Sequence, residues 1–227
     1  MATLIPRPSP GGGMIDASSI ILSARVAQTN AEIFPDVLKL YVPEGAKVLD
    51  MTWGRGVFWK RVPKGAYKIT ANDLDKSRGR YHYDFSHLPP QWKERFDAVV
   101  LDPPYLGVGG IKTLKDSIDR SYNNRLRARK MGAGIKATQR VYAAGMIEAH
   151  RVLRRSGVLI LKAMDQVESG EEQKPLTHEM MELGRILGFK FVDEMIMVLK
   201  HTPMMRHATQ KHSRHNHSSF VVLRRRP

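Results

Sequence analysis

The stretch Arg95–Tyr105, RFDAVVLDPPY, decides the fold of this sequence. Its apolar run from Ala98 to Leu101 stops at Asp102, two prolines and a tyrosine. Apolar residues without alternation are typical of a strand that is buried on both faces of a parallel sheet, and proline cannot continue a sheet ladder. We therefore place Asp102 at the carboxyl end of a central strand. Ligands bind at that edge of an open α/β sheet.

The residues that follow this strand suit the recognition of an NH2 group. Pro103 and Pro104 have a fixed φ and no amide hydrogen, so their carbonyls can be held rigidly beside the Asp102 carboxylate, which only accepts hydrogen bonds when ionised. The structural alternative is a strand that ends in a proline turn, with Asp102 as a helix cap. A motif of this length does not decide between the two by itself.

Asp102-Pro103-Pro104-Tyr105 resembles the aspartate-proline-proline-aromatic motif of the amino-methyltransferases, which methylate exocyclic amines of adenine or cytosine with S-adenosylmethionine. The resemblance implies that Asp102 and the Pro103 carbonyl accept hydrogen bonds from the amine, and that Tyr105 stacks on the base. The candidate catalytic residues are Asp102, Pro103, Pro104 and Tyr105.

Composition limits the classes of protein that this sequence can represent. The chain has 227 residues, 37 Lys and Arg against 22 Asp and Glu, and a net charge of +15, which favours polyanionic partners. It has no cysteine, which excludes disulfides, Cys-ligated zinc and a thiol nucleophile. With no membrane-spanning apolar run and no signal-peptide pattern, we expect a soluble, cytoplasmic protein.

The chain is long enough for one α/β domain. We expect a flexible, Pro- and Gly-rich leader over residues 1–13 and a single domain over residues 14–227. Residues 16–41 show helical spacing that Pro35 interrupts, which predicts two short helices. This region could supply a lid over a cofactor, as in related methyltransferases, or serve packing alone.

A candidate cofactor loop follows the first strand, in Ala46–Trp59, AKVLDMTWGRGVFW. Glycines at a strand-to-helix turn allow tight backbone geometry and close ligand approach, although a dinucleotide-binding turn has the same features. The loop looks like the aspartate-proline-phenylalanine-x-glycine-x-glycine loop of amino-methyltransferases and departs from it at Met51 and Thr52. The cofactor-binding residues that this predicts here are Asp50, Met51, Thr52, Trp53, Gly54 and Gly56.

Two further acidic positions follow predicted strands. YKITANDLD ends in Asp73, which we favour over Asp75 for accepting hydrogen bonds from ribose hydroxyls, with Leu74 beside it. RYHYDFSHLP predicts a third short strand with Asp84 and Phe85. In the family that the sequence resembles, the equivalent acid accepts from the cofactor's adenine amine, and its neighbour packs on the ring. Each Asp alone could instead be a turn or cap residue.

The remaining sequence completes a Rossmann-like arrangement. Residues 138–163 predict a helix, a stop at Gly157 and a buried strand, and residues 177–199 predict a helix, a stop at Gly188 and a strand. Phe220–Leu223 forms the last strand. The resemblance implies an α/β fold, the seven-stranded class I methyltransferase sheet with helices on both faces. The last two strands should form an antiparallel edge pair.

Two basic segments interrupt this pattern. The insert 106–138 is long and polar, which is usual for functional or disordered connections, although a solvated loop would look similar. The loop 200–219 contains five histidines whose spacing does not favour a metal site, so we interpret it as a basic loop near nucleic acid. The candidate nucleic-acid-binding residues are Lys112, Arg120, Arg125, Arg127, Arg129, Lys130 and His217.

The leading interpretation is an S-adenosylmethionine-dependent, site-specific methyltransferase that acts on adenine N6 in DNA, with cytosine N4 as another target. The chain has no large target-recognition domain, so an RNA base methyltransferase is the first alternative. A non-catalytic nucleic-acid-binding protein with the same fold is the second. We expect no metal and no membrane partner, and DNA is favoured over RNA.

Overall fold

A computed structural model describes residues 24–26, 29–104, 135–167, 173–198 and 216–227. The expected leader, most of the basic insert and most of the histidine-rich loop lie outside these residues. The structure has the following helices, 3-10 helices (η) and strands: β1 (Arg25–Val26), α1 (Asn30–Tyr41), β2 (Lys47–Asp50), η2 (Val57–Arg61), β3 (Lys68–Ala71), η3 (Pro90–Trp92), β4 (Phe96–Leu101), α4 (Ile135–Val152), β5 (Leu153–Ala163), β6 (Gln166–Val167), β7 (Gln173–Lys174), α5 (Leu176–Ile186), β8 (Phe189–Val198) and β9 (His217–Arg225).

The main sheet has six strands of four residues or more, and the two-residue β1 pairs with one edge of it. The order is β1-β8-β9-β5-β4-β2-β3. Strands β3, β2, β4 and β5 are mutually parallel, whereas β9 is antiparallel to both β5 and β8. The expected α/β architecture and the antiparallel pairing of the last two strands are confirmed. The β8–β9 pair lies at one end of the six-strand sheet, and only the two-residue β1 pairs with the outer side of β8.

The expectation of seven regular strands fails at the third one. Residues 81–85 contribute only an isolated bridge between Asn72 and Tyr81. The side chain of Asn72 takes the backbone N–H and C=O of Tyr83, groups that a ladder would use, and Asp84 forms a local turn with Ser86. Such side-chain bonds compete with strand pairing. The sheet therefore ends at β3.

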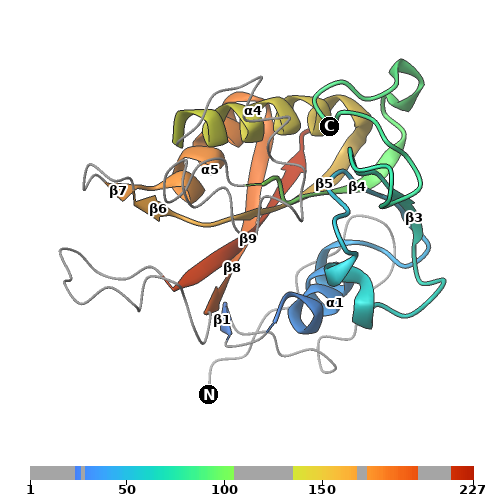
Figure 1. Ribbon diagram of the computed structural model, residues 1–227, viewed down its shortest axis with the longest axis horizontal. Coiled ribbons are helices and arrows are strands. Elements are labelled where there is room, and N and C mark those ends of the chain that lie inside the picture. The colour runs from blue at the N-terminus through green and yellow to red at the C-terminus, as the bar shows by residue number, and fades with distance from the viewer. Residues whose placement is uncertain (1–23, 27–28, 105–134, 168–172, 199–215) are drawn as a thin grey trace.

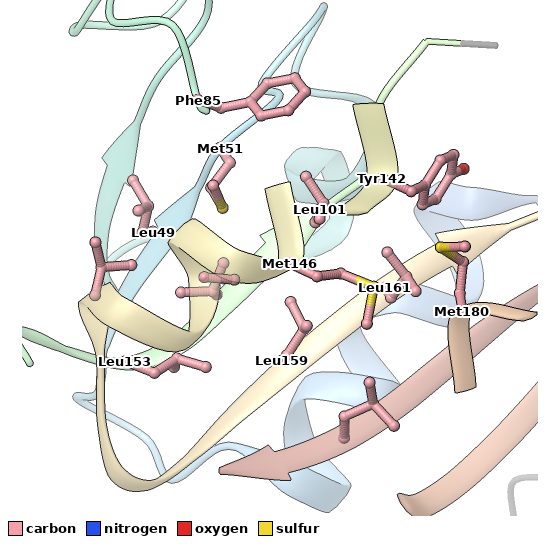
Figure 2. Packing of buried hydrophobic residues seen from close by; sticks show 14 of the residues in the cluster. Leu49, Met51, Phe85, Leu101, Tyr142, Met146, Leu153, Leu159, Leu161 and Met180 are labelled. Carbon is pink, nitrogen blue, oxygen red and sulfur yellow. The ribbon is translucent and has the colours of Figure 1, made fainter. Parts of the chain in front are cut away.

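Helices cover both faces of the sheet (Figure 1). On one face, α4 and α5 pack over Leu49, Leu101, Leu161 and their neighbours, and Figure 2 shows Met146 of α4 among these leucines. On the other face, α1 packs Phe34 and other apolar side chains against the alternate residues of the same strands. Because both faces are buried, the central strands carry continuous apolar sequence, as the run Ala98–Leu101 predicted.

Two local expectations are wrong for identifiable reasons. Pro35 does not separate two helices; it lies inside α1, whose buried residues Phe34, Val37 and Leu38 hold the helix against the sheet. Gly157 does not end a helix; it lies within β5, where the register with β4 shifts. A Cβ atom at Gly157 would lie 2.8 Å from the Arg154 carbonyl oxygen. By contrast, Gly188 follows α5 with φ of +90°, as a helix stop requires.

Candidate functional site

Three charged side chains line up at the carboxyl ends of adjacent parallel strands. Asp50 is the last residue of β2, Asp102 follows β4, and Lys162 is the penultimate residue of β5. The register pairs Asp50 with Val100 and Leu101 with Leu161, so Asp102 and Lys162 form the next pair along. Alternation along the strands places all three side chains on the face that α1 covers. The sequence analysis identified both acids and missed the lysine.

The loop after β2 has the tight backbone that its glycines predict. Gly54 and Gly56 both have positive φ, 57° and 62°, a conformation that favours glycine. A Cβ atom at Gly56 would lie 2.9 Å from the Trp53 ring, so a side chain there would displace the indole. Trp53 stacks on Trp59 with ring centroids 6.0 Å apart. The loop therefore folds against η2, and its two glycines are buried at the carboxyl edge of the sheet.

Asp73 fixes this loop from the neighbouring strand. Its carboxylate accepts hydrogen bonds from the backbone N–H of Gly54 at 2.7 Å and from that of Asp75 at 2.8 Å. Each carboxylate oxygen has a second lone pair, so Asp73 retains the capacity to accept from hydroxyl groups. Asp75 is committed elsewhere: its carboxylate accepts from both the backbone and the hydroxyl of Ser77. Leu74, between the two acids, is half-buried.

Asp50 is a buried carboxyl group, 2% exposed. It accepts hydrogen bonds from the indole N–H of Trp59 at 2.7 Å and from the backbone N–H of Thr52 at 3.0 Å. Burial raises the pKa of Asp50 to about 7; the two hydrogen bonds oppose the rise, and the nearby Asp102 and Asp73 add to it. Met51, the next residue, turns to the opposite face and is buried beside Phe85 in Figure 2.

Asp102 stands at the end of β4 with its backbone tied to the glycine loop. Its backbone N–H donates to the Thr52 hydroxyl at 2.8 Å. Burial raises the pKa of the Asp102 carboxyl, and the positive charge of Lys162 opposes this rise. Pro103 is buried and Pro104 is half-buried, whereas Tyr105 lies outside the described residues. The predicted catalytic motif and the predicted cofactor loop are therefore joined directly.

Asn72 holds three segments of the site together, and sequence reasoning missed it. Its buried side-chain amide donates to the carbonyls of Met51 and Tyr83 and accepts from the Tyr83 N–H. Its backbone bonds to Asp50 and Trp53. The only signal in the sequence was its position directly after a strand and before Asp73. A neutral amide at that place carries no charge pattern that would identify it.

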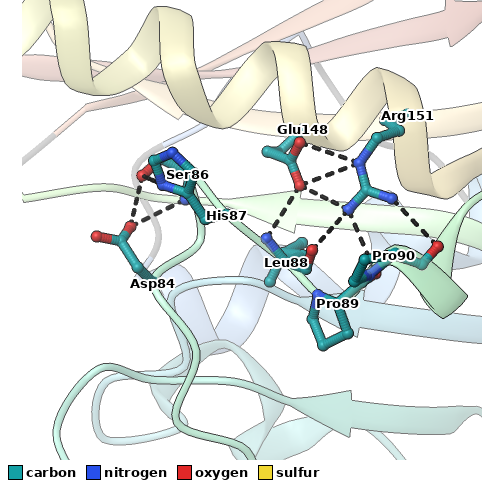
Figure 3. Close-up of polar contacts among 8 residues, drawn as sticks. All are labelled: Asp84, Ser86, His87, Leu88, Pro89, Pro90, Glu148 and Arg151. Atoms are coloured by element: carbon teal, nitrogen blue, oxygen red, sulfur yellow. Dashed lines mark hydrogen bonds and ion pairs between the residues drawn. The ribbon is translucent and has the colours of Figure 1, made fainter.

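The segment that contains Asp84 and Phe85 is attached to α4. Glu148 accepts a hydrogen bond from the backbone N–H of Leu88 at 3.0 Å, and Arg151 donates to the Leu88 carbonyl at 2.9 Å (Figure 3). Glu148 and Arg151 also form an ion pair of 2.7 Å. Asp84 accepts from the backbone and hydroxyl of Ser86. The structure thus gives this acid the turn role that the sequence analysis left open.

Phe85 lies in the core at the same end of the sheet. It is 3% exposed and belongs to the cluster that includes Met51, Leu101 and Tyr142 (Figure 2). A Cβ atom on Gly145 of α4 would lie 3.2 Å from the Phe85 ring, so the helix approaches this segment closely. The aromatic ring thus packs in the same cluster as Met51, the first residue of the loop after β2.

The predicted nucleic-acid-binding residues are mostly outside the described part of the chain. His217 is the exception: it begins β9, pairs with Val198 in register and is partly exposed. Within the described ranges, no helix is long and apolar enough to cross a membrane. The other predicted residues lie outside those ranges: Lys112, Arg120, Arg125, Arg127, Arg129 and Lys130.

Comparison with known proteins places the fold. No protein-family model matches the chain, and no curated protein matches it significantly. Among solved structures, the 1,6-didemethyltoxoflavin-N1-methyltransferase of Burkholderia thailandensis aligns with 87% of this chain and 79% of its own, at 15% identity and a TM-score of 0.53. That structure contains S-adenosylhomocysteine. The [4+2]-cyclase SpnF aligns with 90% of this chain and 85% of its own, at 14% identity and a TM-score of 0.55.

A third neighbour is the putative RNA methyltransferase PH1948 of Pyrococcus horikoshii, with 12% identity, coverage of 87% and 83%, and a TM-score of 0.50. The fold is therefore the Rossmann-like α/β fold of S-adenosylmethionine-dependent methyltransferases. At these identities the likeness concerns the fold alone, and the cyclase shows that the same fold carries other chemistry. Function must be argued from the site.

Proposed function

We propose that this protein transfers a methyl group from S-adenosylmethionine to an exocyclic amine of a nucleic-acid base, with adenine N6 in DNA as the target. The observation that carries the proposal is the junction of two motifs. Asp102-Pro103-Pro104 lies at the carboxyl end of β4 and is hydrogen-bonded through Thr52 to the Gly54–Gly56 loop. A substrate-amine site and a cofactor loop would meet at this point.

The side chains present fit the proposed cofactor chemically. S-adenosylmethionine supplies a methyl group bound to a positively charged sulfonium and carries a ribose diol. The carboxyl groups of Asp50, Asp73 and Asp102 give this edge of the sheet an acidic character, which favours a cation. Asp73 offers acceptor lone pairs to a diol, and the positive-φ glycines allow the tight turn that brings the loop to Asp73. We assign Asp73 and the loop Asp50–Gly56 to the cofactor, with Leu74, Asp84 and Phe85 beside it.

Catalysis in this proposal depends on positioning by the chain's own acceptors. The lone pair of an exocyclic base amine is delocalised into the ring, so the amine is a poor nucleophile. Asp102 and the Pro103 carbonyl would accept its two hydrogens, orient the nitrogen and stabilise the positive charge that develops there during transfer. Tyr105 would stack on the base. A base in a duplex must leave the helix to reach these groups.

The partner assignment rests on charge. The net charge of +15 favours a polyanion. We assign phosphate contacts to His217 at the start of β9 and to six basic residues of the insert, Lys112, Arg120, Arg125, Arg127, Arg129 and Lys130. DNA is the favoured nucleic acid, and RNA is an explicit outcome of the test. A non-catalytic nucleic-acid-binding protein is the remaining alternative.

The decisive experiment incubates the purified protein with methyl-labelled S-adenosylmethionine and, separately, duplex DNA, single-stranded DNA and structured RNA. Nucleosides from each digest are then separated and identified. We expect label in N6-methyladenine from DNA. Label in an RNA nucleoside would move the assignment to RNA, and label in no nucleoside would overturn the proposed function.

The matched variants are Asp102→Ala and Asp97→Asn, which alter two acids at opposite ends of β4. Asp102→Ala should remain folded and bind S-adenosylmethionine but lose on the order of a hundredfold or more in turnover. Asp97→Asn should retain turnover, because Asp97 contacts Lys47 and Arg154 at the amino end of the strand. Near-normal turnover in Asp102→Ala would contradict the assigned role.

A further inference from the structure

Lys162 is a partly buried cation that packing does not require. Its ammonium group lies over the rings of Phe58 and Phe220, 5.7 and 5.5 Å from their centroids, on the face that α1 covers. Burial lowers the pKa of Lys162, and the nearby Asp102 opposes this effect. An apolar side chain of similar length between these two rings would avoid the desolvation cost of an ammonium ion. A lysine in this position therefore points to a functional demand.

The geometry directs this cation toward Asp102. Because Leu101 pairs with Leu161, Asp102 and Lys162 are the next residues in register on adjacent parallel strands, and both side chains project to the α1 face. Within the described residues they form no direct ion pair, so the Asp102 carboxylate is not neutralised by contact. It keeps its lone pairs for another donor.

The ammonium is held in place from α1. Lys162 donates a hydrogen bond to the side-chain carbonyl of Asn30 at 2.6 Å, and Asn30 is the first residue of that helix. Thr29 caps the same helix end through a reciprocal bond with Glu32. The orientation of Lys162 is thus fixed by a capped helix terminus and two aromatic rings.

A second carboxyl group, Asp50, lies near Asp102. Among the described residues, the charged group that acts on Asp102 is Lys162 from β5, and Asp102 in turn acts on Asp50 of β2. Two neighbouring buried carboxyl groups do not both ionise readily. Lys162 favours the charged form of Asp102, whereas Asp102 and Asp73 both disfavour the charged form of Asp50.

We propose that Lys162 is a positioning residue for Asp102. Its ammonium group, anchored by Asn30, keeps the neighbouring carboxylate ionised. The carboxylate can then accept a hydrogen bond from the target amine and stabilise the positive charge that develops on it. The proposal rests on the proposed function, in which the target amine donates its hydrogen bond to Asp102. Lys162 is not among the residues implied by the resemblance to the aspartate-proline-proline-aromatic motif. The proposal also explains why an expensive buried charge is retained beside a catalytic acid.

The test uses Lys162→Met, which removes the charge and preserves the packing length, and Lys162→Arg, which restores a charge. Lys162→Met should fold with an unchanged or higher melting temperature, because an apolar chain replaces a buried ammonium. Arg154→Met is the matched control: it removes a cation from the amino-terminal part of the same strand, where it pairs with Asp97.

The first readout is the pH dependence of kcat, measured with the nucleic acid that becomes labelled in the methyl-transfer experiment. Turnover requires ionised Asp102, so it falls as pH drops through the Asp102 pKa. Loss of Lys162 should move this acid limb upward by about one pH unit. Lys162→Arg should move it back, and Arg154→Met should leave it in place. Superimposable profiles for the wild-type protein and Lys162→Met would overturn the proposal.

The second readout does not depend on activity. Carboxyl 13C resonances of labelled aspartate are titrated by NMR, and the Asp102 signal is identified by its loss in Asp102→Asn. In Lys162→Met this signal should titrate about one pH unit higher than in the wild-type protein. An unchanged titration overturns the coupling even if the enzyme is active. A shifted titration in a protein that methylates nothing supports the coupling and overturns the proposed function alone.

Discussion

The hydroxyl of Thr52 accepts a hydrogen bond from the backbone N–H of Asp102 at 2.8 Å. This bond joins the loop after β2 to the end of β4 and aligns the first residue of the proposed catalytic motif with the proposed cofactor loop. The same loop residue donates its own backbone N–H to Asp50. A single threonine therefore connects both acids on neighbouring strands.

Replacing Thr52 by valine should lower kcat about tenfold, because the Asp102 N–H loses its acceptor and an unpaired, partly buried donor costs about 1–3 kcal/mol. Thr52→Ser keeps the hydroxyl and is the matched control. Steady-state kinetics measures kcat, and calorimetric titration with S-adenosylmethionine measures cofactor affinity separately. Equal turnover in the valine and serine variants would show that the hydrogen bond does not position Asp102.

Asp73 and Asp75 can be distinguished by cofactor affinity. Asp73→Ala should weaken S-adenosylmethionine binding at least tenfold, because it removes both the acceptor for a ribose diol and the partner of the Gly54 N–H. Asp75→Ala should bind normally, since that carboxylate is used by Ser77 and Arg78. Calorimetric titration of both variants with S-adenosylmethionine shows which of the two acids contributes to cofactor affinity. A loss confined to Asp75→Ala would reverse the assignment that we made from the sequence.

The buried Asp50 carboxyl predicts a pH-dependent stability. Its pKa is about 7 in the folded protein against 3.8 in the unfolded chain, so the native state binds more protons between these values. Stability from this group is fully present below about pH 4 and is lost as pH rises through 7. From pH 5 to pH 8 the loss should be about 2–3 kcal/mol.

Asp50→Asn removes this titration, and urea unfolding of both proteins at pH 5 and pH 8 measures it. The difference between the two pH values should be smaller in the variant by about the amount expected for Asp50. The comparison cancels the contributions of all other titrating groups. An identical pH dependence in the two proteins would show that Asp50 is already ionised in the folded state at pH 5.

The ion pair between Glu148 and Arg151 offers a stability test with a control of identical spacing. Arg151→Met should cost about 2–3 kcal/mol, because a mostly buried Glu148 and the Leu88 carbonyl lose their partner. It should also weaken cofactor binding several-fold by loosening the segment of Asp84 and Phe85. Arg185→Met removes the exposed pair with Glu182 on α5 and should cost less than about 0.5 kcal/mol.

Urea unfolding gives both free energies, and hydrogen exchange at the Leu88 N–H reports the local effect, since that group donates to Glu148. Exchange there should accelerate in Arg151→Met and remain unchanged in Arg185→Met. If both variants lose the same small free energy, the network does not hold the segment to α4.

The sequence determined which residues would stand at the carboxyl edge of the sheet. An apolar run closed by a polar residue marks both a buried strand and the side of the sheet on which it ends, because burial on two faces tolerates no alternation. Asp50 and Asp102 were identified in this way. Asp73 follows the mixed edge strand β3 and was identified from its position after a predicted strand. Local pattern is sufficient for such features, since each depends on residues close together in the chain.

Tertiary structure alone decided the contacts between distant segments. Lys162 looks in sequence like one cation beside a strand, and only the register of β4 with β5 and the packing of α1 place it beside Asp102 and Asn30. Similarly, Pro35 fits inside α1 because burial of its neighbours outweighs a proline penalty of about 3 kcal/mol. The strand expected around Tyr83 does not form, because the Asn72 side-chain amide takes the hydrogen bonds of the Tyr83 backbone that a sheet ladder would use. Side-chain partners far apart in the chain set these outcomes, and local propensity does not encode them.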